Sequence, residues 1–339
     1  MDIRYDTPIP NSFGFSVRAA CLVEYDSVGE LISLLYDPSL PRPFFHIGGG
    51  SNLLFTGDYP GTILHSRLRF TEVRPDATVR VGSGVVWDDL CAEMAEAGLW
   101  GTENLSLIPG EAGAAAVQNI GAYGIEAGDL IREVECVDCV SLEQARIPAG
   151  ECRYGYRTSR FKGEWKGRYI VTAVTLALSR EYSPRLDYGH VGDAVKERFG
   201  SLENLTPSML RETVIGIRRT KLPEPSETGS AGSFFRNPFV SREQCDRVLQ
   251  IAGRDGLGNV PHFDNPDGTV KIPAAWLIEK CGWKGYREGN AGVWPQQPLV
   301  LVNLNGKASP SEIMGLEDKI RQSVYDRFGI ELIPEVEHI

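Results

Sequence analysis

The sequence predicts an α+β protein with more than one domain, on three observations. The chain has 339 residues, more than a single ordinary core accommodates, so two or three domains are expected. Helix and strand patterns alternate along its length. A stretch rich in Pro, Gly and Ser, residues 222–232, separates a part with two glycine-rich loops from a C-terminal third that mixes strands and helices.

The helices are placed by their cap residues. Ser27, Ser241 and Ser309 each stand three residues before a Glu or Gln, which is the spacing of a capping box. Thr206 precedes a proline, which suits the first helical position. From these caps and from apolar periodicity we expect helices at residues 31–36, 87–97, 207–219, from 241 onward, 273–282 and 310–328.

The strands are placed by short apolar runs. Residues 169–178 are apolar on both faces, which predicts a strand covered on two sides. The other runs predict strands at residues 44–47, 79–81, 299–302 and 331–339. Cys136 and Cys139 form a CxxC inside a further strand-like run, where residues three apart point to opposite faces, so we expect structural thiols rather than a metal site.

Composition excludes several classes of protein. Hydrophobic residues make up 42% and charged residues 24% of the chain, which is typical of a globular protein and not of a disordered one. The formal net charge is −10 and no basic run suits a phosphate backbone, so nucleic acid is not an expected partner. Neither a membrane helix nor a secretory signal is indicated, and we expect a cytoplasmic protein.

Two glycine-rich loops are the strongest functional pattern: HIGGGSNLLF, residues 46–55, and IPGEAGAAAVQNIGAYG, residues 108–124. Neither has the spacing of a Rossmann or P-loop fingerprint. Consecutive glycines nevertheless expose backbone N–H groups that bind anions, above all phosphate. The second loop leads into a helix whose N-terminus also favours a pyrophosphate, and Gln118 and Asn119 are suited to bonding the edge of a heterocycle. Each loop alone is compatible with simple turns, but two in one domain favour a dinucleotide.

Seven motifs occur in an order that resembles the UDP-N-acetylenolpyruvoylglucosamine reductase (MurB) family. They are HIGGGSNLLF, IPGEAGAAAVQNIGAYG, CRYGYRTSRFK, IRRTKLPEP, GSFFRNP, IPAAWLIEKCGWKG and PEV. The resemblance implies an FAD-binding region in two parts, of the vanillyl-alcohol-oxidase type, plus a smaller α+β substrate domain. The implied boundaries are 1–66, 67–221 and 222–328, with residues 329–339 returning to the FAD-binding region.

The same resemblance implies a reaction. The family reduces UDP-N-acetylglucosamine enolpyruvate to UDP-N-acetylmuramate in peptidoglycan precursor synthesis, with bound FAD and with NADPH as co-substrate. Hydride addition to the enolpyruvyl carbon leaves an enolate that must be stabilised and protonated. The matching residues are Arg157 and Glu335 for stabilisation and Ser233 for protonation. Taken alone, these residues are typical of a basic surface, an exposed carboxylate and a turn hydroxyl, and their spacing does not show that they meet.

Binding residues are implied by the same motifs. For FAD they are Gly48, Gly49, Gly50, Ser51, Asn52, Pro109, Gly110, Gly113, Ala114, Gln118, Asn119, Gly121, Ala122, Tyr123, Gly124 and Arg218. For substrate they are Tyr156, Tyr188, Lys221, Asn237, Gln296 and Gln297. Tyr188 matches the tyrosine of a loop that closes over substrate in the longer family type, although core packing explains a lone tyrosine equally well. Glu337 departs from the pattern, which leads us to expect Arg there.

Two other functions stay open at this point. One is a different flavoprotein oxidase or dehydrogenase on the same scaffold. The other is a noncatalytic nucleotide-binding module, which would bind uridine nucleotides without turnover. We expect a monomer.

Overall fold

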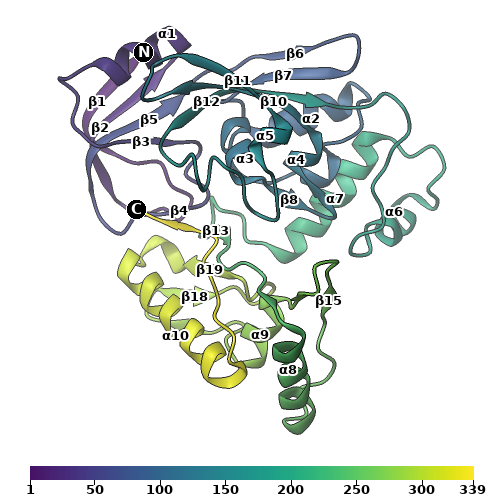
Figure 1. Cartoon of the computed structure of the whole chain (residues 1–339). Coiled ribbons are helices and arrows are strands. Elements are labelled where there is room, and N and C mark those ends of the chain that lie inside the picture. Colours follow the sequence, from purple (N-terminus) through teal and green to yellow (C-terminus); the bar gives the residue numbers. More distant parts are fainter. The chain divides into compact units, whose positions relative to one another are not determined.

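The computed structural model describes residues 1–339 and divides into two compact units (Figure 1). Unit 1 comprises Met1–Ile9, Arg18–Gly50 and Asp58–Arg218, and unit 2 comprises Pro10–Val17, Ser51–Gly57 and Arg219–Ile339. Two short segments from the N-terminal part of the chain therefore belong to the same unit as its C-terminal third. None of the helices combines the length and the apolar character that crossing a membrane requires.

The first sheet of unit 1 has the strand order β1-β2-β5-β3. The strands are β1 (Asp2–Pro8), β2 (Arg18–Tyr25), β5 (Tyr59–Ser66) and β3 (Phe44–Ile47), and β5 is parallel to both of its neighbours. Helix α1 (Val28–Tyr36) buries Leu31 and Leu34 in the core of this sheet. Its predicted cap is confirmed: the Ser27 hydroxyl accepts the Glu30 N–H. The Glu30 carboxylate accepts the N–H of Asp26, one residue before the position that a reciprocal capping box uses.

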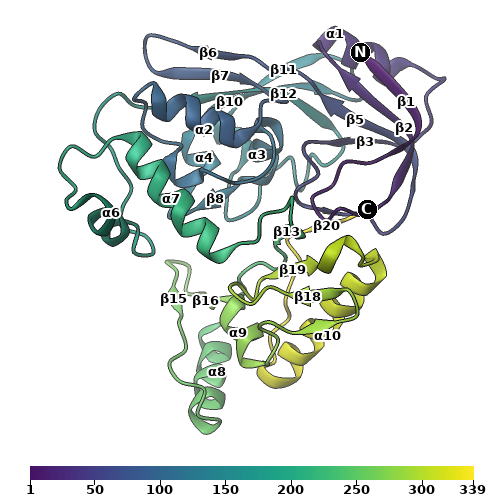
Figure 2. The same cartoon turned by 180° about the vertical axis from the view of Figure 1, so that it is seen from behind.

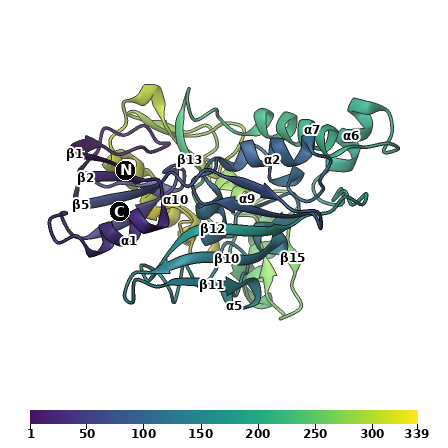
Figure 3. The same cartoon turned by 90° about the horizontal axis from the view of Figure 1, so that it is seen from above.

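The second sheet of unit 1 is antiparallel, in the order β11-β10-β12-β7-β6. Its strands are β6 (Thr71–Val73), β7 (Thr78–Gly82), β10 (Ile131–Asp138), β11 (Gln144–Pro148) and β12 (Tyr169–Ala177). Figure 3 shows β12, β10 and β11 side by side. Seven consecutive residues of β12 are buried, which confirms the predicted strand with both faces covered.

Helices cover one face of this second sheet. They are α2 (Trp87–Glu96), α3 (Ala112–Gln118), α4 (Ala127–Leu130) and, at its edge, α5 (Ala149–Cys152). Trp87, Leu90 and Met94 of α2 share one core cluster with buried residues of β7, β10 and β12. Between these elements lie η1 (Glu103–Leu105) and the short pair β8 (Gly121–Ala122) and β9 (Ile125–Glu126).

Two further helices complete unit 1, α6 (Val191–Phe199) and α7 (Pro207–Lys221). They share a small core with Trp100. Seen from behind, α7 runs beside α2 (Figure 2), and two contacts join them. The Ser208 hydroxyl donates to the Ala95 carbonyl oxygen, and Arg211 forms a two-pronged ion pair with Asp88. These contacts fix the N-terminal part of α7 against α2, which itself packs on the second sheet.

Unit 2 is built around the antiparallel sheet β13-β19-β18-β17. Its strands are β13 (Gly229–Ser233), β19 (Val300–Asn303), β18 (Ala291–Val293) and β17 (Arg287–Glu288). The helices are α8 (Arg242–Arg254), α9 (Ala274–Lys280) and α10 (Pro310–Phe328), with η2 at Leu304–Gly306. The smaller pairings are β14 (Phe239–Val240) and β15 (Phe263–Asp264) with β16 (Val270–Lys271), and β4 (Leu53–Leu54) with β20 (Glu337–His338).

Most predicted elements of unit 2 are confirmed. Both reciprocal bonds of a capping box are present at Ser241 and at Ser309. The predicted apolar stripe of α10 is buried, namely Ile313, Leu316, Ile320, Val324 and Phe328.

Two expectations for unit 2 were too broad. The stretch at residues 222–232 is not linker throughout, because its last four residues lie in β13. A Cβ at Gly229 would lie 2.1 Å from the Phe13 carbonyl oxygen, so a small residue is needed for a close backbone approach. The expected terminal strand at residues 331–339 shortens to β20.

The α10 stripe gives a test of the packing of unit 2. Replacing the fully buried Ile320 by Ala should lower the free energy of unfolding by about 2–5 kcal/mol, because it removes buried methyl groups and leaves a cavity. Tyr325 on the same helix is 56% exposed and is the matched control; Tyr325→Ala should change stability by no more than about 0.5 kcal/mol. Urea unfolding followed by circular dichroism measures both. Equal losses in the two variants would contradict the assigned core face.

Candidate functional site

The two glycine-rich loops lie against each other in unit 1. A Cβ added at Gly48 would lie 3.0 Å from the Ala114 Cβ and 3.3 Å from a carboxylate oxygen of Glu111. A Cβ at Gly49 would lie 3.7 Å from the Cα of Gly110. We call Gly48–Gly50 together with Pro109 and Gly110 the glycine cradle. The structure therefore brings together two loops that are about sixty residues apart in the sequence.

Two backbone donors at the start of α3 are already used within the protein. The N–H of Ala112 donates to the Val85 carbonyl oxygen (2.9 Å), and the N–H of Gly113 donates to that of Ser83 (3.0 Å). These two donors are therefore not available to a pyrophosphate. A Cβ at Gly113 would lie 2.7 Å from the Ser83 Cβ, so this glycine is required for the packing of α3 against the loop after β7.

Asn119 is engaged with the protein on both ends of its amide. It caps α3 in the left-handed region (φ 48°) and is fully buried. Its Nδ2 donates to Glu126 (2.7 Å) and to the Gly155 carbonyl oxygen (2.8 Å), and its Oδ1 accepts the N–H of Gly128 (2.7 Å). Asn119 thus holds three segments together and shapes the site, while the preceding Gln118 is half-buried at the end of α3.

Arg218 is a half-buried cation with an unused donor. It lies on α7, and its Nε is buried without a hydrogen-bond partner. Burial lowers the pKa of Arg218 from its usual value; Tyr123 and Asp88 act in the opposite direction, and the charge of Arg157 lowers it further. Burying an unpaired donor on a charged group is costly, so an anionic or hydrogen-bond-accepting ligand at this point would complete it.

Arg157 is positioned by the second glycine-rich loop. It has a positive φ of 53°, and its guanidinium donates to the Gly121 carbonyl oxygen. A Cβ at Gly121 would lie 2.7 Å from its Nη1, so Gly121 is needed for this contact. The guanidinium carbon lies 5.6 Å from the centre of the Tyr156 ring. Tyr188, half-exposed, lies with its Cβ 3.1 Å from a Cβ placed at Gly124 and so contacts the same loop.

The segments that carry Ser233 and Glu335 pair with each other in unit 2. Ser233 ends β13, and the two phenylalanines that follow it are fully buried. The Phe234 carbonyl oxygen accepts the N–H of Glu335 (2.7 Å), while the Asn52 side chain donates to the Glu335 carbonyl oxygen (3.2 Å). The paired aromatic rings (centroids 5.2 Å apart) thus anchor the chain on either side of the serine, which is itself only half-buried.

The other predicted substrate residues of unit 2 are mostly at turns. The Asn237 Oδ1 accepts the N–H of Ala274 at the start of α9 (3.0 Å). The Gln297 side chain accepts the N–H of Leu299, and Gln296 and Lys221 are exposed.

The predicted site residues are divided between the two units. Unit 1 contains Gly48, Gly49, Gly50, Pro109, Gly110, Gly113, Ala114, Gln118, Asn119, Gly121, Ala122, Tyr123, Gly124, Tyr156, Arg157, Tyr188 and Arg218. Unit 2 contains Ser51, Asn52, Lys221, Ser233, Asn237, Gln296, Gln297 and Glu335.

Sequence reasoning missed three residues with unusual environments. Glu111 lies inside the second quoted loop and contacts the glycine cradle, and its carboxylate bonds His65 (2.8 Å). Nothing in the local sequence of His65 distinguishes it from an ordinary strand residue. Arg236, two residues after the phenylalanine pair begins, has a buried Nε without a partner; a cation directly after two buried aromatics was the available clue.

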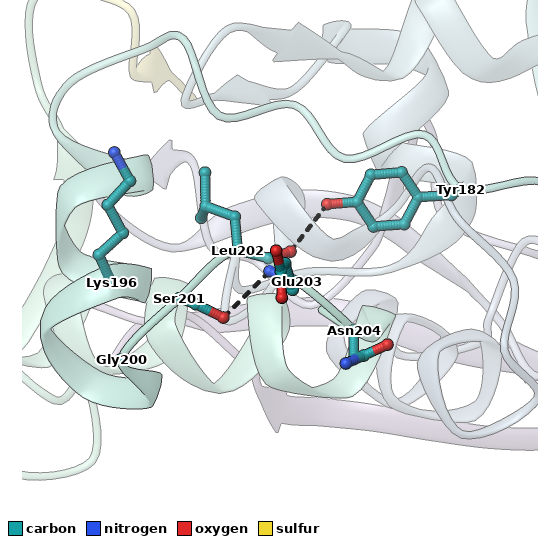
Figure 4. Close-up of a pocket in the computed structure, with 7 residues that line it drawn as sticks. All are labelled: Tyr182, Lys196, Gly200, Ser201, Leu202, Glu203 and Asn204. Atoms are coloured by element: carbon teal, nitrogen blue, oxygen red, sulfur yellow. Dashed lines mark hydrogen bonds between the residues drawn. The ribbon is translucent and has the colours of Figure 1, made fainter.

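A hollow elsewhere in unit 1 contains none of these residues. It is lined by Tyr182, by Lys196 of α6 and by residues between α6 and α7 (Figure 4), namely Gly200, Ser201, Leu202, Glu203 and Asn204. Two local hydrogen bonds lie here: the Tyr182 hydroxyl donates to the Leu202 carbonyl oxygen, and the Glu203 N–H donates to the Ser201 hydroxyl. We assign it no function.

The network around Asn119 can be tested by its effect on stability. Asn119→Ala should lower the free energy of unfolding by about 2–4 kcal/mol, because the buried groups of Gly128 and Gly155 lose their partner. Gln118→Ala, one residue earlier, is the control and should change stability by about 0.5 kcal/mol or less. Urea unfolding measures both. An Asn119→Ala protein as stable as the wild type would show that the network contributes nothing.

Comparison with known proteins agrees with this arrangement. Residues 19–141 match the model of the FAD binding domain, and residues 224–339 match that of the UDP-N-acetylenolpyruvoylglucosamine reductase C-terminal domain. The chain is 45% identical over 343 residues to the UDP-N-acetylenolpyruvoylglucosamine reductase of Bacteroides fragilis (strain YCH46), covering 100% of both chains. It is 42% identical over 331 residues to that of Chromobacterium violaceum, covering 96% of this chain and 95% of the other.

A solved structure matches in fold. The crystal structure of UDP-N-acetylenolpyruvylglucosamine reductase (MurB) from Thermus caldophilus aligns with this chain with a TM-score of 0.67 at 22% identity. The alignment covers 97% of this chain and 95% of the other. The predicted fold class, an FAD-binding region plus a MurB-type α+β domain, is confirmed. The glycine cradle and the unpaired Nε of Arg218 fit an FAD group. The chain belongs to the UDP-N-acetylenolpyruvoylglucosamine reductase (MurB) family and is an FAD-dependent oxidoreductase.

Proposed function

We propose that this chain reduces UDP-N-acetylglucosamine enolpyruvate to UDP-N-acetylmuramate with NADPH, a step of peptidoglycan precursor synthesis. The observation that carries the proposal is the pairing of the Ser233 segment with Glu335 on a buried aromatic anchor, in a chain that matches such reductases over its full length. When bound, FAD accepts hydride from NADPH and supplies it to the enolpyruvyl carbon.

The FAD-binding residues are assigned from the shapes and donors in unit 1. The glycine cradle would receive the diphosphate, because side chains larger than hydrogen would fill the space at Gly48 and Gly49. Arg218 would direct its unpaired Nε toward the flavin or its phosphate chain. The second loop at residues 121–124, and Ser51 and Asn52 after the first loop, complete the proposed set.

Stabilisation of the enolate requires hydrogen-bond donors at the substrate carboxylate. Arg157 supplies a permanent cation, and its contact with Gly121 fixes its direction. Glu335 stabilises an enolate by donating from its carboxyl O–H, since an ionised carboxylate only accepts hydrogen bonds. Preorganised donors of this kind typically contribute about 3–4 kcal/mol each to transition-state stabilisation.

Ser233 is the proposed proton donor to the neighbouring carbon. Its hydroxyl is a weak acid, but an enolate carbon is a strong enough base to take the proton. Gly232 before it has a positive φ of 68°, and buried Phe234 follows it, so the backbone on both sides is constrained. Such fixed orientation is what general acid catalysis requires.

Substrate binding is assigned to residues of both units. Lys221 and Asn237 would contact the diphosphate and uridine end. Tyr156, Gln296 and Gln297 are the other proposed contacts. Tyr188 would mark the longer family type, in which a tyrosine loop closes over substrate; its exposure and its contact with Gly124 support this assignment. We further propose that the protein acts as a monomer.

The proton-donor role can be tested by separating the two half-reactions. In Ser233→Ala, anaerobic flavin reduction by NADPH should stay near normal, while flavin reoxidation by the enolpyruvyl substrate should slow by about 10²–10⁴-fold, the usual contribution of a general acid. Ser230→Ala, in the same strand, is the control for loss of a hydroxyl. Stopped-flow flavin absorbance measures both rates. Equal slowing of both half-reactions, or unchanged turnover, would count against a proton-donor role for Ser233.

The placement of FAD can be tested with a single methyl group. Gly49→Ala leaves ordinary contact distances in the flavin-free fold, because the nearest atom to the new Cβ is 3.7 Å away. It should nevertheless raise the dissociation constant of FAD at least about tenfold, or about 1.4 kcal/mol, by occupying the cradle. Gly57→Ala, where nothing lies within 4 Å of the added Cβ, is the matched control. Flavin fluorescence titration provides the measurement. Wild-type FAD affinity in Gly49→Ala would show that the diphosphate does not bind in the glycine cradle.

A further inference from the structure

A histidine in unit 1 is held between two carboxylates next to the glycine cradle. His65 lies on β5, opposite Glu24 of β2 in the parallel register. Its Nδ1 is 3.0 Å from a carboxylate oxygen of Glu24, and its Nε2 is 2.8 Å from one of Glu111. The side chains of His65 and Glu111 are only 13% and 7% exposed, so the bridge is largely shielded from water.

The geometry specifies the charge of this bridge. A carboxylate only accepts hydrogen bonds, and a neutral imidazole donates from one nitrogen alone. Both short contacts of His65 are therefore satisfied only when the ring carries two protons and a positive charge. The bridge then holds one net negative charge; loss of the proton raises this to two and leaves one carboxylate facing a ring lone pair.

Glu111 connects the bridge to the cradle. Its Oε1 contacts His65, whereas its Oε2 lies 3.3 Å from the position of a Cβ on Gly48. Glu24 has cations on its other oxygen, Arg4 at 2.7 Å and Arg67 at 4.0 Å. For Glu111 the only cationic partner is His65. A bare carboxylate at this point would repel a diphosphate in the cradle.

We propose that the Glu24–His65–Glu111 bridge neutralises Glu111 beside the glycine cradle, so that FAD affinity depends on the charge of His65. The inference rests on the proposed placement of the FAD diphosphate at Gly48–Gly50. It assigns His65 a positioning and charge-compensating role: the histidine acts through Glu111 and is not itself a contact of the reacting groups.

The neighbouring titratable groups leave this role to His65. Burial lowers the pKa of His65, but the hydrogen bonds and charges of Glu111 and Glu24 outweigh it, so the net shift is upward. On β3, burial and the charge of His65 lower the pKa of His46 to about 3, which keeps that ring neutral. On β2, burial raises the pKa of Tyr25, whose hydroxyl contacts His46 (2.9 Å), so it is also uncharged.

The sign of the effect follows from the raised pKa. Below the pKa of His65 the imidazole ring carries both protons, and its positive charge compensates the Glu111 carboxylate beside the cradle. As pH rises through that pKa, His65 loses its positive charge. The charge of Glu111 is then no longer compensated, and anion binding in the cradle weakens. FAD affinity should therefore be highest at the acidic end of a range from about pH 6 to 9, which brackets an upward-shifted histidine.

The test is the dissociation constant of FAD across this range, measured by flavin fluorescence on the flavin-free protein. The wild type should lose about tenfold in affinity, or about 1.4 kcal/mol, between the two ends. His65→Gln, fixed neutral, should bind weakly at both ends. Glu111→Gln removes the charge that needs compensation and should bind tightly at both ends. Glu24→Gln should keep the pH dependence with its midpoint shifted to lower pH.

Three results would overturn the inference. They are a wild-type affinity that does not change with pH, a His65→Gln protein with the wild-type profile, and a Glu111→Gln protein with the wild-type profile. Circular dichroism identifies any variant that does not fold. If His65→Gln does not fold, the FAD affinity of Glu111→Gln decides the question. Gly49→Ala distinguishes failure of the proposed FAD placement from failure of the bridge proposal. Wild-type FAD affinity in Gly49→Ala would reject the placement of the diphosphate. Weak FAD binding in Gly49→Ala, together with a wild-type profile in His65→Gln, would reject only the role of the bridge.

Discussion

The contact between the two glycine-rich loops is the constraint on which unit 1 depends. The end of β3 meets the start of α3 so closely that Gly48 has no room for a side chain against Ala114 and Glu111. The same helix is fixed from its other side by Gly113, which packs on Ser83, and by backbone bonds to residues 83–85. The first sheet, the second sheet and α3 thus converge on one small volume. Gly48 and Gly49 contribute no side chain to it, which is what a backbone-lined anion site requires.

In unit 2 the corresponding constraint is the burial of Phe234 and Phe235. The two rings fill the interior, and their backbone bonds to Leu299 on one side and to Glu335 on the other. Burying an aromatic pair of this kind contributes several kcal/mol, which is enough to hold an irregular segment in a single conformation. The polar residues that flank the pair, Ser233 and Arg236, are thereby held in place by apolar packing together with backbone pairing, to Val300 and Ile333 respectively.

Local sequence patterns predicted the elements well because they report local physics. The caps at Ser241 and Ser309 and the stripe on α10 depend only on residues within one or two turns. The stretch before Ser233 was misassigned because small residues serve both flexible linkers and close backbone contacts, and only the position of Phe13 distinguishes the two. Likewise, no pattern in its strand indicates that His65 meets Glu111, since that pairing is created by the packing of α3 on a distant sheet. The motifs supplied the candidate site residues, but the hydrogen bonds of Asn119 and those at the start of α3 required coordinates.

The charges of unit 1 are arranged for an anion rather than for stability alone. Burial lowers the pKa of Arg218, and the charge of Arg157 lowers it further. Asp88, whose charge raises the pKa of Arg218, already forms a two-pronged pair with Arg211. A protein selected only for stability would relieve this imbalance, because uncompensated buried charge is costly. Binding of an anionic cofactor or substrate removes the imbalance in the folded state alone, so by mass action the same charges that weaken the empty protein should make the loaded protein more stable.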